Sequence, residues 1–318
     1  MLLGKISIIL ILLFIYQGLP RLGYARVLFV DENTDFNSPW LDTQLGPEES
    51  LKKILRIITR SQVGKELLQL ANRKAYQQGE TLFDIIKVGE ISVSDTTLLR
   101  KFYPQNPEQI IYETRSKIFL NKELNLMDGV LDLAHELTHF THRSSFNPYQ
   151  NNFNLIDFIK STIEGTGGEV DAFLTECRIL KELFGSTNKY NGNCKKLLDP
   201  IKGDFSRERG IELFYQVGEY YKATVKTINM YGDDVNLLGN LNSHDAIYIS
   251  SAYGLPYPLA AVKEFVSIMD RVCQNDQKRL SLMKTKSARM PASVDREYNI
   301  QKIDKEYLSF KQRCQKHI

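Results

Sequence analysis

The stretch NLMDGVLDLAHELTHFTHR, from Asn125 to Arg143, governs the interpretation of the rest of the chain. Its apolar residues recur with the spacing of one helix face, so the stretch predicts a partly buried helix. Asp128 falls in the first turn and His142 in the last turn, where charges of these signs suit the helix dipole. The apolar residues of this face are Leu126, Val130, Leu131, Leu133 and Ala134.

Three residues of this helix, His135, Glu136 and His139, form the pattern H-E-x-x-H. Residues four apart project from the same face of a helix, so both imidazoles can reach one metal ion. Glu136 follows the first histidine and is expected to act as a general base instead of a ligand. The sequence therefore predicts a Zn²⁺ site with His135 and His139 as ligands. The alternative is a surface helix with two incidental histidines.

The segment from Lys117 to Phe140 resembles the core of zincin metallopeptidases, in which an edge strand of a sheet precedes the active-site helix. The resemblance covers roughly residues 85 to 185 and is loose outside the five-residue motif. It implies a peptide or protein substrate that pairs with an edge strand, which would be Lys117–Leu120.

The branch of the zincins follows from the residues after the motif. Metzincins continue to a glycine and a third histidine, but these positions hold His142 and Ser145 here. The chain is more similar to gluzincins and minigluzincin-type cores, where a glutamate on a second helix completes the metal site. By this resemblance Glu169 is the expected third ligand. It opens a predicted helix that ends at Phe184, and it lies on the same stripe as that helix's apolar residues.

Family patterns often place a small residue three positions after this glutamate, and Ala172 fits. They often place an acid at the next position, which is Phe173 here, and this departure leaves the surroundings of the ligands open. Asp171 is a candidate to orient a ligating histidine instead.

Other assignments of the third ligand stay open at this stage. Glu164, at the end of a helix predicted from Leu155, is the main alternative, and Glu176 is a more distant one. A further alternative needs no metal, because Thr166-Gly-Gly-Glu169 has the spacing of a capping box.

Several other polar residues are candidates for supporting roles. His142 shares a helix face with His135, and we expect it to be structural, with a supporting or substrate-contacting role as the alternative. Related enzymes often stabilise the oxyanion with a tyrosine or histidine from the C-terminal half. His244, Tyr248 and Tyr253 are the candidates for that role, with ordinary packing as the alternative.

The first 25 residues read as a secretory signal peptide removed after Ala25. Lys5 precedes an apolar run from Ile6 to Tyr16, which is short against the roughly 20 residues that span a bilayer. An uncleaved anchor is the alternative. We therefore expect a secreted or periplasmic protein with no membrane span after cleavage.

The chain contains four cysteines, all after the predicted cleavage position. An even number in an exported protein predicts two disulfides, and four cysteines allow three pairings. Proximity along the chain favours Cys177–Cys194 and Cys273–Cys314.

The predicted fold is α+β and dominated by helices, with a small sheet, the active-site helix and a glutamate-bearing helix at its core. The predicted divisions are a zincin-like core over residues 26–185 and a mostly helical region over 186–318 that completes or flanks the cleft. Arg26–Pro47 is expected to be an N-terminal arm, with a short prosegment as the alternative. Further helices are expected over Glu48–Gln78, Ile211–Met230, Pro258–Leu282 and Asp295–Gln315, and short strands over Ile110–Tyr112 and Lys117–Leu120.

These observations together predict an exported zinc metallopeptidase. The alternatives are a zinc amidase that acts on cell-wall or other non-protein amides, and a non-catalytic exported interaction protein. The net charge of +3 over 318 residues gives no electrostatic reason to expect a nucleic-acid partner.

Overall fold

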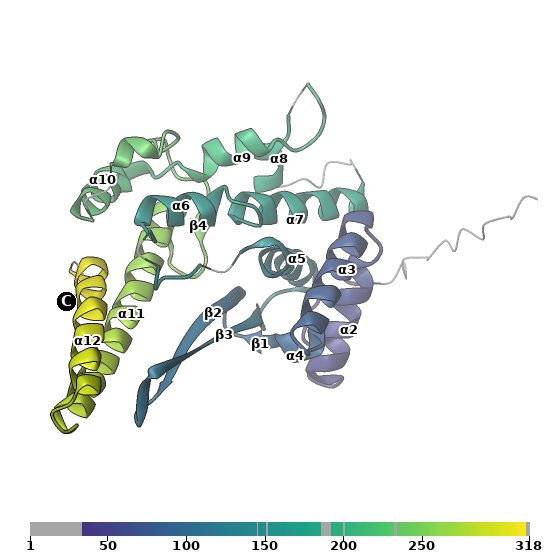
Figure 1. Cartoon of the computed structure of the whole chain (residues 1–318). Coiled ribbons are helices and arrows are strands. Elements are labelled where there is room, and N and C mark those ends of the chain that lie inside the picture. Colours follow the sequence, from purple (N-terminus) through teal and green to yellow (C-terminus); the bar gives the residue numbers. More distant parts are fainter. Residues whose placement is uncertain are drawn as a thin grey trace, which may run out of the picture. The chain divides into compact units, whose positions relative to one another are not determined.

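The computed structural model in Figure 1 describes residues 34–144, 146–150, 152–185, 192–199, 201–231 and 234–315. Phe36–Ile318 forms one compact unit. The predicted signal peptide lies outside the described residues. The predicted division at residue 185 stays a prediction.

The unit is α+β and dominated by helices, as the sequence predicted. Its sheets are small: one has three strands and the other two. The helices are α2 (Gly46–Ile58), α3 (Gln62–Gln77), α4 (Leu82–Ile85), α5 (Leu126–His142), α6 (Leu155–Ile163), α7 (Glu169–Phe184), α8 (Asn193–Leu197), α9 (Arg207–Phe214), α10 (Tyr221–Met230), α11 (Tyr257–Ala288) and α12 (Val294–Cys314), with short 3-10 turns at Gly218–Tyr220 and Val235–Leu237. The strands are β1 (Ile86–Gly89), β2 (Val93–Tyr103), β3 (Asn106–Asn121), β4 (Ile249–Ser250) and β5 (Leu255–Pro256).

The single helix predicted over Glu48–Gln78 is wrong, because the chain turns between α2 and α3. The Ser61 side chain accepts a hydrogen bond from the Gly64 amide at 3.0 Å and so caps a new helix. A Cβ at Gly64 would lie 2.2 Å from the carbonyl oxygen of Ile58, so only glycine lets α3 begin this close to α2. The apolar repeat continues through the turn, which is why periodicity alone did not reveal it.

The three-stranded sheet has the order β1-β3-β2, with β1 parallel and β2 antiparallel to β3. The two short strands predicted at Ile110–Tyr112 and Lys117–Leu120 are parts of the single strand β3. Lys117–Leu120 therefore lies in the central strand, where β2 pairs along one side and β1 pairs with Ile118–Asn121 on the other. The prediction that it forms the substrate-binding edge was wrong, and the edge strands are β1 and β2.

The β2–β3 hairpin runs alongside the C-terminal helices α11 and α12 (Figure 1). The Arg279 Nε of α11 donates a hydrogen bond to the carbonyl oxygen of Pro107 at 2.7 Å. Arg100 of β2 forms an ion pair with Asp276 of α11. These contacts hold the far end of the hairpin against the helices.

Two hydrophobic clusters form the core, and α7 contributes to both of them. One cluster joins α2, α3, β1, β3 and α5, and it includes Ile179 of α7. The other joins α6 and the C-terminal helices, and it includes Val170 and Leu174 of α7. Helix α7 packs beside α5 along its length, so it sets the position of the motif helix relative to the C-terminal region.

The predicted disulfides are confirmed. Cys177–Cys194 joins α7 to α8, and Cys273–Cys314 joins α11 to the end of α12. Among the described residues, none of the helices is both long enough and apolar enough to cross a membrane.

Candidate functional site

Close packing at its first turns fixes the position of helix α5. Asn125 caps the helix by accepting a hydrogen bond from the Asp128 amide at 2.8 Å. A Cβ at Gly129 would lie 3.1 Å from Trp40, so the glycine leaves room for the indole. Trp40 is buried, and its Nε1 donates a hydrogen bond to the carbonyl oxygen of Asn121 at 2.6 Å. The end of β3 and the start of α5 are thereby held together.

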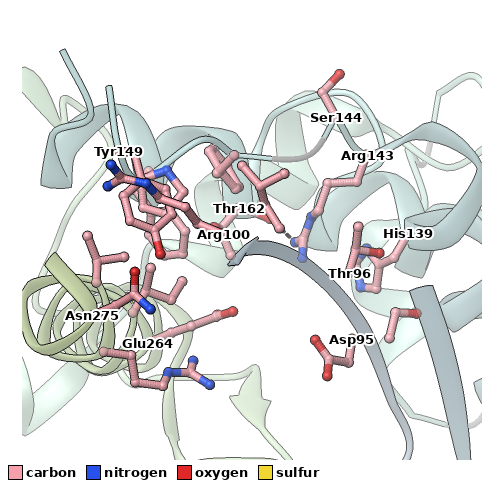
Figure 2. Close-up of a pocket in the computed structure, with 18 residues that line it drawn as sticks. Asp95, Thr96, Arg100, His139, Arg143, Ser144, Tyr149, Thr162, Glu264 and Asn275 are labelled. Atoms are coloured by element: carbon pink, nitrogen blue, oxygen red, sulfur yellow. Dashed lines mark hydrogen bonds between the residues drawn. The ribbon is translucent and has the colours of Figure 1, made fainter. Parts of the chain in front are cut away.

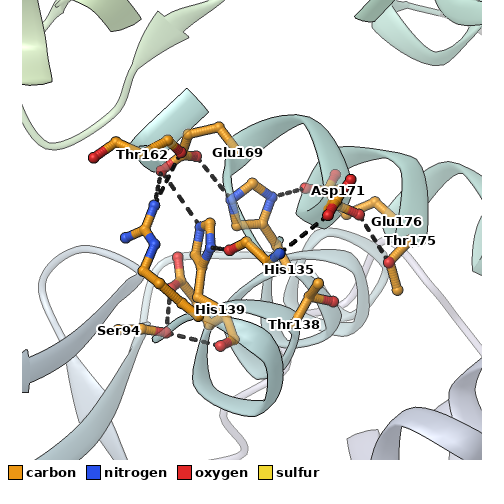
Figure 3. Close-up of polar contacts among 12 residues, drawn as sticks. Ser94, His135, Thr138, His139, Thr162, Glu169, Asp171, Thr175 and Glu176 are labelled. Atoms are coloured by element: carbon orange, nitrogen blue, oxygen red, sulfur yellow. Dashed lines mark hydrogen bonds and ion pairs between the residues drawn. The ribbon is translucent and has the colours of Figure 1, made fainter. Parts of the chain in front are cut away.

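His135, His139 and Glu169 converge where the middle of α5 faces the first turn of α7 (Figure 3). Glu169 Oε2 lies 3.2 Å from His135 Nε2, and Glu169 Oε1 lies 3.4 Å from His139 Nε2. Within the described part of the chain, no other group of three histidine, cysteine or acidic side chains brings its ligand atoms within 4.8 Å of one another.

A glycine turn before α7 permits this approach. Gly167 has a φ of +68°, and a Cβ there would lie 2.6 Å from the amide nitrogen of Arg143. Glycine is therefore required for both the backbone conformation and the space. The Gly167 carbonyl oxygen accepts a hydrogen bond from His139 Nδ1 at 2.8 Å, so the same turn also orients a motif histidine.

Both motif histidines are oriented through Nδ1. His139 Nδ1 faces the Gly167 carbonyl, and His135 Nδ1 faces the carboxylate of Glu176. Both acceptors require a proton on Nδ1, so Nε2 is the nitrogen that carries the lone pair when the ring is neutral. The two Nε2 atoms face Glu169. A carboxylate or carbonyl behind the ring is the usual arrangement for a histidine that binds a metal.

The charges in this cluster are strongly coupled. Burial would raise the pKa of Glu169, but the imidazoles of His139 and His135 hold it well below its usual value. Burial would lower the pKa of His135, but the carboxylates of Glu176 and Glu169 raise it well above its usual value. Both shifts have the same physical cause, which is the attraction between a positively charged imidazole and a carboxylate held close together.

The donor set fits a zinc ion. Two imidazole nitrogens and one carboxylate are the protein ligands of one common class of catalytic zinc sites, which keep a fourth position open. Zinc–nitrogen bonds of about 2.0–2.1 Å place tetrahedral ligand atoms about 3.3 Å apart. The Glu169 carboxylate approaches the two imidazole nitrogens at comparable separations, with Oε2 3.2 Å from His135 Nε2 and Oε1 3.4 Å from His139 Nε2.

Glu136 is buried beside this cluster and is not one of its three members. The hydroxyl of Ser94, on edge strand β2, lies 2.7 Å from Glu136 Oε2 and 2.8 Å from the Glu136 carbonyl oxygen. A hydroxyl carries one proton, so Ser94 donates to one of these oxygens at a time. The contact fixes the carboxylate relative to the edge strand.

The alternatives for the third ligand lie elsewhere. Glu164 accepts a hydrogen bond from the Tyr215 hydroxyl at 3.1 Å and is not part of the cluster. Glu176 contacts His135 Nδ1, the nitrogen that faces away from Glu169, and so supports that ring. The capping box predicted as an alternative is absent, because α7 begins after Gly168 with no side-chain cap.

Asp171 was predicted to orient a motif histidine directly, but its contacts are with the turn at Gly167 and with Arg207. It accepts hydrogen bonds from the Gly167 amide at 3.0 Å and from Arg207 Nε at 2.9 Å. It therefore holds the turn whose carbonyl orients His139, and the two motif histidines contact other groups.

The remaining predicted candidates do not join the cluster. His142 is exposed at the end of α5, and its Cβ packs beside Gly167. The Tyr248 hydroxyl donates to the carbonyl oxygen of Asn193 at 3.1 Å. His244 and Tyr253 are both exposed.

Tyr257, at the start of α11, is the tyrosine that does lie among the acidic groups. Burial raises its pKa well above the usual value, and the nearby carboxylates of Glu169, Glu176 and Glu136 add to the effect. Neither Tyr257 nor Ser94 stands in a recognisable motif, so neither was among the predicted site residues. Pro258 at the start of a predicted helix was the one signal near Tyr257.

A cavity of about 320 Å³ opens beside His139 (Figure 2). Its walls come from β2, the segment after α5, α6 and one face of α11.

No family model matches this chain, and neither a curated protein nor a solved structure matches it.

Proposed function

We propose that this protein is a zinc-dependent hydrolase that cuts peptide bonds. The observation that carries the proposal is the convergence of His135, His139 and Glu169, with each Nδ1 held from behind and each Nε2 facing the carboxylate. Imidazoles oriented in this way are typical of metal sites, and a simple ion pair does not require such orientation.

The chain's own residues supply the acid–base chemistry. Zinc, when bound, polarises a carbonyl and lowers the pKa of a water towards about 7. In this proposal Glu136 takes the proton from the attacking water and delivers it to the leaving amine. Ser94 holds Oε2 of this carboxylate, which leaves Oε1 for the proton transfer.

The sheet offers a surface for the substrate. Strand β2 pairs with β3 on one side, and no described strand pairs with its other side. An extended peptide can add to such an edge through main-chain hydrogen bonds. Ser94 connects this strand directly to Glu136, so a peptide bound there would lie next to the general base.

The resemblance to zincins supports the same proposal. The H-E-x-x-H helix, a glutamate from a second helix and an edge strand beside the motif are the parts that the resemblance implies, with β2 in place of Lys117–Leu120 as the edge. Two disulfides are in keeping with an exported enzyme.

Zinc content and peptide hydrolysis test the proposal together. Purified wild-type protein should hold about one zinc per chain. His139→Ala and Glu169→Ala should lose it, whereas Glu136→Gln and the control Glu164→Ala should keep it. Glu136→Gln should lose hydrolysis of a peptide library. Well-folded wild type that takes up no zinc, or a Glu136→Gln variant with full activity, would overturn the proposal.

A further inference from the structure

The cavity beside His139 contains a carboxylate that has no partner among the described residues. Glu264 of α11 lines the cavity, and its side chain extends towards the space between α11 and Asp95 (Figure 2). No hydrogen bond or ion pair joins it to another described residue. Burial raises the pKa of this carboxyl, although the nearby charge of Arg143 opposes the shift. A half-buried carboxylate without a partner is costly, and a ligand that supplies the partner explains it.

The cations around the cavity have other partners or are exposed. Arg143 donates to the Thr162 carbonyl at 3.1 Å and lies 3.4 Å from Glu169, so its guanidinium is engaged on the metal-binding side. Arg100 forms a buried ion pair with Asp276. Arg271 is exposed, and solvent screens its charge. None of these groups forms an ion pair with Glu264.

The other walls suit a long aliphatic chain. Ile268 and Val272 follow Glu264 at helical spacing on the same face of α11, and Leu98 of β2 and Phe158 of α6 also line the cavity. Lysine and arginine side chains bury their methylene groups against apolar surface of this kind while the charged end reaches a polar group. Asp95 adds a second carboxylate to the wall formed by β2.

The size of the cavity distinguishes between two sources of a cation. A substrate could present its α-amino group or a basic side chain. About 320 Å³ lies within the usual range for ligand pockets, and it is far more than an ammonium group alone requires. The size of the cavity and the apolar residues in its lining therefore favour a side chain.

We propose that this cavity binds the lysine or arginine side chain of a substrate residue next to the bond that is cut, with Glu264 as the anchor for its charge. This inference rests on the proposed peptidase function. It assigns to Glu264 the role of a specificity-determining residue.

Paired peptides test the inference on the zinc-loaded full-length protein. One peptide of each pair carries lysine or arginine near the scissile bond, and the other carries norleucine or citrulline. Wild type should cut the basic peptide with a kcat/KM on the order of 10²-fold higher, and Glu264→Gln should remove most of that difference. Asp270→Asn removes the same charge from the same helix outside the cavity, so it should keep the preference.

Two kinetic results would overturn the inference while the peptidase function stands. The first is equal hydrolysis of basic and neutral peptides by wild type. The second is an equal fall in kcat/KM for both peptides of a pair when their N-termini are acetylated, lost in Glu264→Gln, which would assign Glu264 to the α-amino group.

Binding to the Glu136→Gln variant separates this inference from the proposed function. Fluorescence anisotropy should show tighter binding of the lysine peptide than of the norleucine peptide to this variant. In the double variant Glu136→Gln/Glu264→Gln the two peptides should bind equally. If wild type cuts no peptide but this difference persists, the cavity assignment stands and the peptidase proposal fails. If the two peptides bind equally, the cavity assignment is wrong.

Discussion

Glu169 and Glu176, two turns apart on α7, face opposite nitrogens of the same His135 ring. Glu169 lies 3.2 Å from Nε2, and Glu176 contacts Nδ1. Because both carboxylates project from one helix face, the rotation of α7 about its axis sets both contacts at once. Burial raises the pKa of Glu176 to about 7, and the nearby His135 opposes this shift.

Glu176→Gln should weaken zinc binding about 10- to 100-fold, because an amide holds the ring less firmly and removes the charge that strengthens its basicity. The zinc dissociation constant can be measured by competition with a chelator. Glu164→Gln is the matched control, since Glu164 lies outside the cluster, and its dissociation constant should not change. Equal affinities for both variants would show that Glu176 does not support His135.

Gly167→Ala should destabilise the fold by about 1–3 kcal/mol, because the new Cβ would lie 2.6 Å from the Arg143 amide nitrogen. It should also weaken zinc binding, because the turn would shift and displace the carbonyl oxygen that orients His139. Gly203 has a similar φ of +66° but nothing within 4 Å of its Cβ position. Gly203→Ala should therefore cost only about 1 kcal/mol and leave zinc binding intact. Urea unfolding and a chelator titration of both variants would check this. Equal effects of the two variants would show that the turn does not hold the site.

Local patterns could predict about half of the candidate site. His135, Glu136 and His139 form a contiguous motif, and Glu169 begins a helix with a clear apolar stripe. Glu176 was predicted only as a distant alternative ligand. Its actual contact depends on how α7 is rotated against α5, which no local pattern records.

The sheet was predicted less well for a physical reason. Strand β2 was missed because an edge strand beside a cavity is polar, and its residues include Ser94, Asp95 and Thr96. Polar residues from Glu113 to Arg115 also interrupt the apolar pattern of β3, so one long strand was read as two short ones. Without β2, the remaining strand was assigned to the edge.

Ser94→Ala should lower kcat about 10-fold while the zinc content stays the same. The variant loses one hydrogen bond to Glu136, with a net worth of about 1–1.5 kcal/mol. Ser94→Thr keeps the hydroxyl and should restore most of the activity. Steady-state kinetics with elemental analysis would test both variants. An unchanged kcat in Ser94→Ala would show that Glu136, the proposed general base, needs no support from the edge strand.

Removal of Cys273–Cys314 should cost more stability than removal of Cys177–Cys194. The sequence separations are 41 and 17 residues, and loop-closure entropy then gives about 4 and about 3 kcal/mol. Paired cysteine-to-serine variants can be compared by denaturant unfolding. A larger loss for the shorter loop would mean that native contacts, and not chain entropy, dominate the difference.

Asp276→Asn should destabilise the protein by about 3–5 kcal/mol, because it leaves two buried arginines without their shared counter-charge. Asp276 is 3% exposed and pairs with Arg100 of β2 and Arg313 of α12. Glu49→Gln breaks an exposed pair on α2 and should cost less than about 1 kcal/mol.

The segment in which hydrogen exchange accelerates first distinguishes a local role of Asp276 in holding β2 from a general loss of stability. Asp276 links the edge strand to both C-terminal helices, so its loss should release β2 before the rest of the fold. Hydrogen exchange in Asp276→Asn should therefore accelerate first in Val93–Tyr103, while amides of α5 remain protected. Uniform acceleration across both elements would show that the ion pairs stabilise the whole unit and do not hold the edge strand β2 in particular.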